Sequence, residues 1–149
     1  MSPSNESVRR AIYLLPLASL LLAMAHVGFE HFNGGVKSHH LLNRADLPAI
    51  SNWFGLIVLP LLGGGLALRA GAYVSSKRWA GLPVSIWTPT LGALAYGAIL
   101  AVSFTLDAPA VTNAAFYGLF AAAVALPIYR VEFVFGFVLG MTFTVGSVL

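Results

Sequence analysis

The sequence predicts an all-α integral membrane protein, a bundle of five transmembrane helices or, alternatively, of four. Of its 149 residues, 58% are hydrophobic and only 9% are charged, whereas soluble domains contain about 25% charged residues. Several apolar segments approach the roughly 20 residues that a helix needs to cross the hydrocarbon core. No shift in composition marks a second domain. We therefore expect a single transmembrane helical domain over residues 1–149.

The first predicted span is Ile12–Phe29, preceded by a polar stretch, residues 1–10, that we expect to be frayed. Two arginines, Arg9 and Arg10, followed by an apolar run and the small residues of Ala23–Ala25, are also typical of a secretory signal peptide. The sequence therefore leaves two alternatives for this segment, a retained first helix or a signal removed by cleavage.

A polar connection, residues 30–52, separates the first two spans. Gly34 and Gly35 predict the end of the first helix, because consecutive glycines favour a left-handed turn over further helix. Ser38 suits the N-cap of a short helix from His39 to Leu47. Polar residues share one face of that helix and leucines lie elsewhere on it, so we expect it to lie along the membrane interface.

The other apolar segments predict the later spans. Ser51 or Asn52 is expected to cap the second span, and Asp107 to close the third. A tight turn around Pro127 separates the last two spans; if it is instead a kink in one tilted helix, the bundle has four spans. The predicted limits are Trp53–Leu68, Leu82–Leu106, Thr112–Ile128 and Val131–Leu149.

The last span contains two sequence patterns, a pair of opposite charges at its start and a pair of glycines further along it. Arg130 and Glu132 are close enough in sequence to form a local ion pair where the helix begins. Gly136 and Gly140 form a GxxxG pattern, which favours close contact with another helix. That partner is expected either within the bundle or in a homo-oligomer through the same two glycines.

The distribution of basic residues predicts the orientation. With the N-terminus in the cytoplasm, six of the eight lysines and arginines lie inside and only Lys37 and Arg44 lie outside, as the positive-inside rule requires. This arrangement suits a multi-pass protein of a bacterial-type inner (plasma) membrane, in contact with membrane lipids. Because the basic residues occur singly or in pairs at the ends of apolar segments, no nucleic-acid partner is expected.

Histidines and carboxylates in and beside the first connection are the candidate functional residues. His26 and Glu30 are four residues apart and share one helix face, which suits an acid–base pair, so we predict both as catalytic residues. The zero cysteines exclude thiolate ligands, and three histidines with a carboxylate around an open position would suit zinc or iron. The predicted metal ligands are His26, Glu30, His39, His40 and Asp46, with His31, Asn43, Asn52 and Asp107 as secondary candidates.

The His-x-x-x-Glu spacing of His26 and Glu30 at a helix end resembles that of small membrane sterol isomerases of the EXPERA type. The likeness covers five residues, and neither an activity nor a site residue is inferred from it.

Two functions fit these residues. The first is a metal-dependent or acid–base membrane enzyme that acts on a lipid-like substrate. The second is a small ion, proton or small-molecule transporter, a channel, or an accessory subunit without catalysis. A structural alternative also stands, in which the connection is an interfacial loop whose polar groups only hydrogen bond to lipid and backbone.

Overall fold

The computed structural model describes residues 3–40, 46, 48–75 and 82–145. Within these ranges it is mostly helical, with five α-helices and one small two-stranded antiparallel sheet, so the predicted all-α character is confirmed. In chain order the elements are α1 (Pro3–Phe32), β1 (Ser38–His40), β2 (Ala49–Ser51), the 3-10 helix η2 (Asn52–Phe54), α2 (Gly55–Ser75), α3 (Leu82–Thr105), α4 (Pro109–Ala125) and α5 (Val131–Val145).

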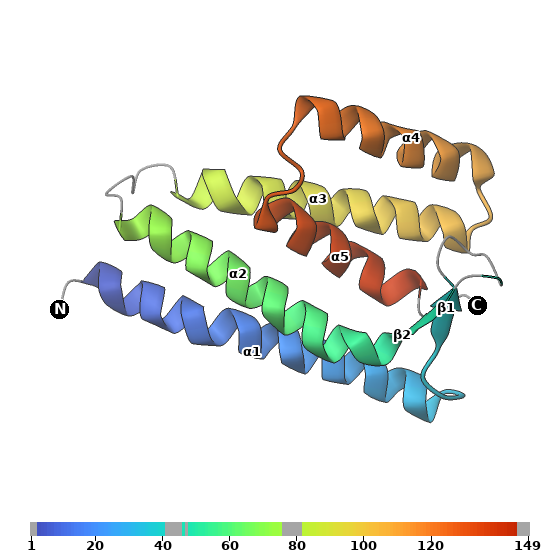
Figure 1. Ribbon diagram of the computed structural model, residues 1–149, viewed down its shortest axis with the longest axis horizontal. Coiled ribbons are helices and arrows are strands. Elements are labelled where there is room, and N and C mark those ends of the chain that lie inside the picture. Colours follow the sequence, from blue (N-terminus) through green and yellow to red (C-terminus); the bar gives the residue numbers. More distant parts are fainter. Residues whose placement is uncertain (1–2, 41–45, 47, 76–81, 146–149) are drawn as a thin grey trace.

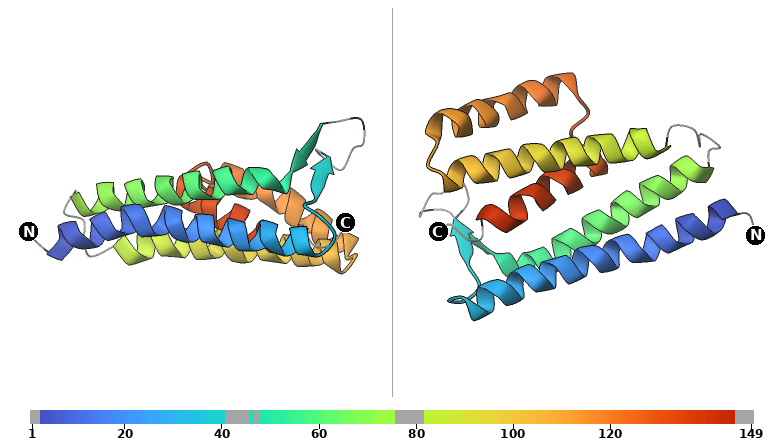
Figure 2. Two further views of the ribbon diagram at one scale, coloured as in Figure 1. Left: turned by 90° about the horizontal axis from the view of Figure 1, so that it is seen from below. Right: turned by 180° about the vertical axis from the view of Figure 1, so that it is seen from behind.

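The helices lie roughly side by side in a row whose order differs from their order in the chain. Figures 1 and 2 show α1 beside α2, then α5, then α3, with α4 at the far edge. The last helix of the described chain is therefore inserted between the second and the third. Along the direction of the helix axes, the small sheet and the α3–α4 connection lie at one end of the bundle, and the N-terminus lies at the other end.

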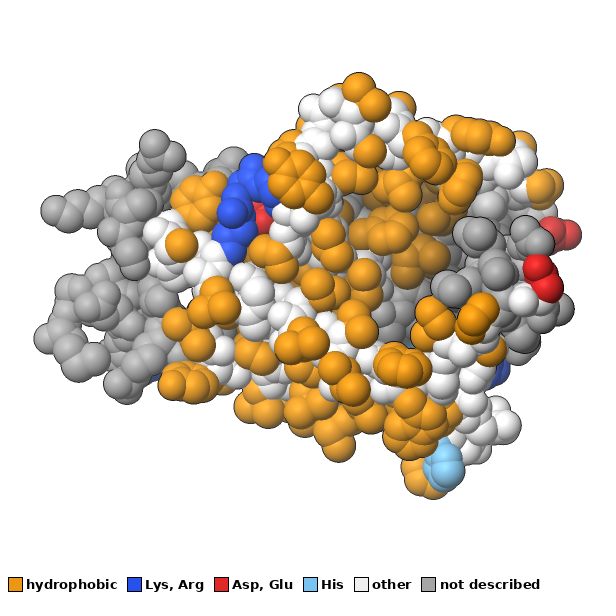
Figure 3. Space-filling model, in the orientation of Figure 1, with side chains coloured by type: hydrophobic (Ala, Val, Ile, Leu, Met, Phe, Trp, Pro, Cys, Tyr) orange, Lys and Arg blue, Asp and Glu red, His pale blue; other side chains and the backbone are white. Residues whose placement is uncertain are grey.

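Three of the helices are long and apolar enough to cross a membrane, and they provide the segments Ile12–Phe32, Asn52–Tyr73 and Ile86–Ser103. α4 and α5 are apolar but shorter, with 17 and 15 residues. Large hydrophobic side chains are exposed along the bundle, and one whole face is dominated by them (Figure 3). Such extended apolar surface is unusual for a soluble monomer.

Small residues allow α3 and α5 to approach closely. A Cβ atom at Gly136 would overlap with the carbonyl oxygen of Thr90, and one at Gly140 would overlap with that of Leu94. A Cβ at Gly97 would lie 2.5 Å from the carbonyl oxygen of Phe137. The close helix contact expected of Gly136 and Gly140 is thus made within the chain, while a homo-oligomer through the same glycines stays a prediction.

α1 begins at Pro3, and proline is favoured in the first turn of a helix, where its missing N–H costs no bond. The fraying of residues 1–10 stays a prediction. One prediction about local structure is wrong. The short interfacial helix does not begin at His39, because residues 38–40 form a strand. Ser38 pairs with Ser51 and His40 with Ala49, so long-range pairing outweighs local helix preference. Residues 41–45 and 47 of the predicted helix lie outside the described residues.

Candidate functional site

The candidate site begins at the C-terminal end of α1, where one helix face presents His26 and Glu30. The Nε2 atom of His26 lies 3.6 Å from Oε1 of Glu30, and only 9% and 3% of the two side chains are exposed. The pairing predicted from the four-residue spacing is therefore present in the structure. A carboxylate this deeply buried requires partners to offset its lost hydration.

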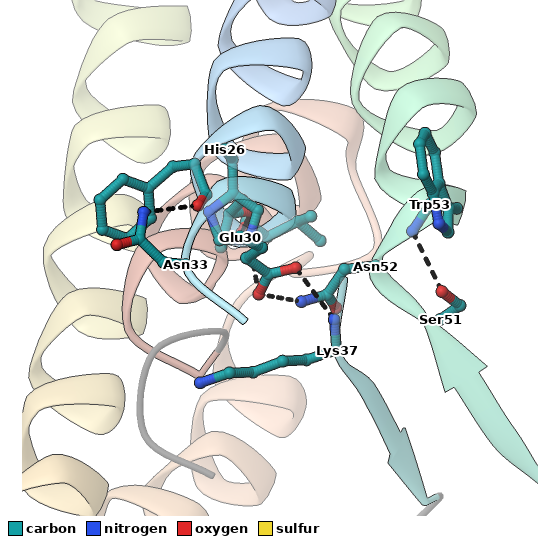
Figure 4. Close-up of polar contacts among 10 residues, drawn as sticks. His26, Glu30, Asn33, Lys37, Ser51, Asn52 and Trp53 are labelled. Atoms are coloured by element: carbon teal, nitrogen blue, oxygen red, sulfur yellow. Dashed lines mark hydrogen bonds and ion pairs between the residues drawn. The ribbon is translucent and has the colours of Figure 1, made fainter. Parts of the chain in front are cut away.

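Those partners come from the chain that returns after α1. The side-chain amide of Asn52 donates to Oε1 of Glu30 at 2.7 Å, and the backbone N–H of Lys37 donates to Oε2 at 3.3 Å (Figure 4). Among the described residues, no lysine or arginine side chain forms an ion pair with Glu30. Its negative charge is therefore stabilised by neutral donors and by one titratable ring, His26.

Two glycines turn the chain back toward Glu30. Gly34 and Gly35 have φ angles of +113° and +101°, which glycine adopts without strain. The N–H of Gly35 bonds to the carbonyl oxygen of Glu30 at 3.0 Å and closes the helix end. The expected stop at these glycines is confirmed, and it brings Lys37 over the carboxylate.

Asn52 is held by its own backbone at the start of the second helical segment. Its N–H donates to the carbonyl oxygen of Lys37 at 2.9 Å, continuing the contacts of the sheet by one residue. Ser51 caps η2, and its hydroxyl accepts from the N–H of Trp53 at 3.4 Å. The predicted cap at Ser51 is confirmed, which leaves the Asn52 side chain directed at Glu30 (Figure 4).

A pocket of about 390 Å³ borders this cluster. His26 and Asn52 lie on its wall, and its other lining residues, among them Val58 and Met141, are mostly apolar and come from α1, β2, η2, α2 and α5. Most ligand pockets combine such an apolar lining with a few polar groups. The site therefore offers an apolar chain a place beside a histidine–carboxylate pair.

The other predicted site residues are not brought to Glu30 by any described contact. His31 is exposed and its ring meets that of Phe32 edge-on at 5.4 Å. Asp46 lies exposed in a turn, and Asp107, exposed with a φ of 48°, follows α3. The side chains of His39 and His40, and the whole of Asn43, lie outside the described residues. Within the part that is described, no group of three His, Cys, Asp or Glu side chains forms a metal site.

A second buried cluster, at the opposite end of the bundle, was only partly predicted. Glu132 is fully buried, and Nη2 of Arg130 lies 2.8 Å from its Oε1, as expected of the local pair. Arg69 also reaches it from α2: its Nε lies 2.7 Å from Oε2 and donates to Oε1 at 3.0 Å. The hydroxyl of Tyr73 accepts from Nη2 of Arg130 at 3.3 Å.

The contribution of Arg69 has no local sequence signal, because 63 residues separate it from Glu132. The one available clue is that a carboxylate within an apolar helix must find a cation or a proton. We name these four residues, Arg69, Tyr73, Arg130 and Glu132, the arginine cluster.

Comparison with known proteins adds no family to this description. Neither the models of protein families, nor the curated proteins, nor the solved structures contain a match to this chain.

Proposed function

We propose that the protein is a multi-pass membrane protein whose His26–Glu30 pair does acid–base chemistry on a lipid-like molecule held in the adjacent pocket. The observation that supports this most is the environment of Glu30. Its carboxylate is 3% exposed, bonds to two neutral donors, and has a histidine ring on the pocket wall as its only titratable partner among the described residues. A pair that lacks a fixed cation can take up or release a proton without breaking an arginine or lysine ion pair.

The apolar surface and the charge distribution support the proposed membrane insertion. Three helices have the length and composition of spans, and a surface rich in exposed leucine, phenylalanine and valine is more stable against lipid tails than against water. With the N-terminus in the cytoplasm, the positive-inside rule places the small sheet and the His26–Glu30 pair at the outer side. α4 and α5, though short, complete five spans in this proposal.

The contacts of Glu30 and His26 suggest a different role for each side chain. Glu30 is fixed by Asn52 and Lys37, so it is suited to orient His26 and to stabilise its protonated form. The His26 ring borders the pocket and is the group that would exchange a proton with a bound molecule. A zinc or iron centre stays a further proposal, and it would need His39 or His40 as an additional ligand.

Lipid analysis tests the chemistry. We expect cells that express the chain to accumulate or lose a lipid relative to cells that express Glu30→Gln, because the amide keeps the shape and loses the charge. Asp46→Asn is the matched control, since it makes the same change at an exposed carboxylate. Identical lipid profiles for the chain and for Glu30→Gln would contradict the enzyme. Dissipation of a pH gradient in vesicles by the chain and not by Glu30→Gln would instead assign the pair to proton transport.

Photocrosslinking tests the pocket. A diazirine-labelled fatty acid should label residues of the pocket, and Val58→Phe should abolish most of that labelling by filling it. Ile57→Phe is the control, because Ile57 is on the same helix, is exposed and does not line the pocket. Equal labelling of both variants would show that the fatty acid does not occupy this site.

Thiol labelling tests the insertion and its direction. The chain contains no cysteine, so Ser38→Cys, in β1, and Arg10→Cys, in the first half of α1, each supply one reactive group toward opposite ends of the bundle. An impermeant maleimide added to intact cells should label Ser38→Cys alone. Labelling of Arg10→Cys alone would reverse the orientation, and labelling of neither or both would contradict it.

A further inference from the structure

The arginine cluster has more positive charge than its carboxylate requires. Two guanidinium groups face the single carboxylate of Glu132. Among the side chains that the structure describes, the other carboxylates are those of Glu30, Asp46 and Asp107, which follow or end the elements at the small-sheet end of the bundle (Figure 1). The cluster therefore retains one positive charge after Glu132 is neutralised.

The hydrogen bonds of Arg69 leave most of its donors unused. It contacts Glu132 only through Nε, and its guanidinium carbon lies 5.4 Å from the centre of the Tyr73 ring. Its two terminal nitrogens, which bear four of its five N–H groups, have no hydrogen-bond partner among the described residues. The side chains of Arg69 and Arg130 are 33% and 29% exposed. Nε of Arg130 is buried, whereas the terminal nitrogens of Arg69 are not among the buried unpaired atoms, so these donors are accessible from outside the bundle.

The position of the cluster matches that of lipid headgroups. Arg69 lies four residues before Tyr73, where the apolar segment of α2 ends, which is roughly 6 Å along the helix axis. Long basic side chains at this depth extend toward the interface. Figure 3 shows basic side chains and an acidic one forming a small patch inside a surface of hydrophobic side chains, an arrangement suited to a molecule with one anionic group and apolar tails.

We propose that Arg69 and Arg130 bind the phosphate group of an anionic phospholipid at the cytoplasmic side of the membrane. The terminal nitrogens of Arg69 donate to the phosphate oxygens, since a guanidinium matches the geometry of a phosphate. Glu132 holds Arg69 by its Nε, which fixes the direction of the free donors. The acyl chains lie against the exposed apolar surface beside α2 and α5. This inference rests on the proposed membrane insertion and not on the His26 pocket.

Native mass spectrometry of the purified full chain tests the proposal. The protein is placed in mixed micelles with equal amounts of dioleoyl-phosphatidylglycerol and dioleoyl-phosphatidylcholine, and we expect phosphatidylglycerol to be the lipid that stays bound. Arg69→Gln should lower its binding about fivefold, the factor expected for one arginine at an anionic surface. Arg10→Gln, at an exposed arginine toward the same end, should leave the binding unchanged.

Arg69→Lys keeps the test valid if the glutamine variant does not fold. Its ammonium group still neutralises Glu132, but it loses the fork of terminal nitrogens, so we expect a folded protein with reduced phosphatidylglycerol binding. Undiminished binding by Arg69→Lys would overturn the proposal, because the arginine would then serve Glu132 alone. An equal loss in Arg10→Gln, or thermal stabilisation by inorganic phosphate and not by phosphatidylglycerol, would overturn it as well. Thiol labelling reports separately on insertion, and the fatty-acid crosslink reports on the pocket.

Discussion

Glu30 and Glu132 are both buried carboxylates, yet they are stabilised in different ways. Glu132 is fully buried and two arginines lie within 3 Å of its oxygens. Glu30 is nearly as buried, but an amide, a backbone N–H and a histidine surround it. The first arrangement pairs the carboxylate with two permanent cations, because arginine does not lose its proton in proteins. The second has no arginine or lysine ion pair among the described residues, and its one titratable partner there is the His26 ring.

This difference separates a structural carboxylate from a candidate catalytic one. A charge that is locked by arginines stabilises the packing of α2 against α5 and orients the arginines themselves. The carboxylate held by neutral donors beside a pocket is the one that, in the proposed function, orients the histidine that exchanges a proton. Variants at the two glutamates and their partners test this distinction directly.

The largest difference is expected between Glu132→Gln and Glu30→Gln. Removing the Glu132 charge leaves two cations close together with one partner lost, and we expect a loss of about 3 kcal/mol in the free energy of unfolding. Glu30→Gln turns one acceptor into a donor facing the Lys37 N–H, with an expected loss of about 1–2 kcal/mol. SDS-induced unfolding in detergent, followed by circular dichroism, measures both. Equal losses would mean that Glu30, too, is mainly a structural charge.

A loss smaller than that of Glu132→Gln is expected from Asn52→Ala. The substitution removes the 2.7 Å bond to Glu30 and should cost about 2 kcal/mol, the penalty of a buried acceptor without its donor. Asn33→Ala is the matched control, because the Asn33 side chain is exposed and its described hydrogen bond is to the Phe29 carbonyl of α1; its effect should stay within about 0.5 kcal/mol. If the two variants lose equal stability, Asn52 does not stabilise the buried carboxylate.

The smallest expected effect is that of Tyr73→Phe. It removes the hydroxyl that accepts from Arg130 at 3.3 Å and keeps the ring beside Arg69, so we expect a loss of about 0.5–1 kcal/mol. Tyr129→Phe, at a tyrosine that is 83% exposed, should have no measurable effect in the same unfolding assay. A loss as large as that of Glu132→Gln would show that the tyrosine, rather than the carboxylate, holds the arginines.

Local patterns in the sequence predicted the helices and the two ion pairs between residues close in the chain, His26–Glu30 and Arg130–Glu132. Apolar runs located all five helices, and a four-residue spacing predicted that His26 and Glu30 would meet. What the sequence could not predict depends on pairing between distant segments. The three-residue strands are too short for a periodic signal, and they exist because residues 38–40 pair with 49–51.

The same limit applies to the partners of the carboxylates. Asn52 is only a secondary candidate in the sequence analysis, because Glu30, to which its side chain donates a hydrogen bond, is 22 positions away. Arg69 directly follows the predicted second span, Trp53–Leu68, and nothing in the local sequence links it to Glu132. The insertion of α5 between α2 and α3, which no local pattern specifies, is what brings that pair together.

The position of α5 has a consequence for the order in which the protein folds. The α1–α2 hairpin, with its Glu30–Asn52 contact, joins residues close in the sequence and can form while the rest of the chain is still being synthesised. The gap between α2 and α3, in contrast, can be filled only after α5 has left the ribosome. Until then Arg69 lacks Glu132, the carboxylate with which it pairs in the folded protein. We expect nascent chains arrested before Val131 to contain the α1–α2 hairpin. The space between α2 and α3 that α5 fills should remain empty in these chains.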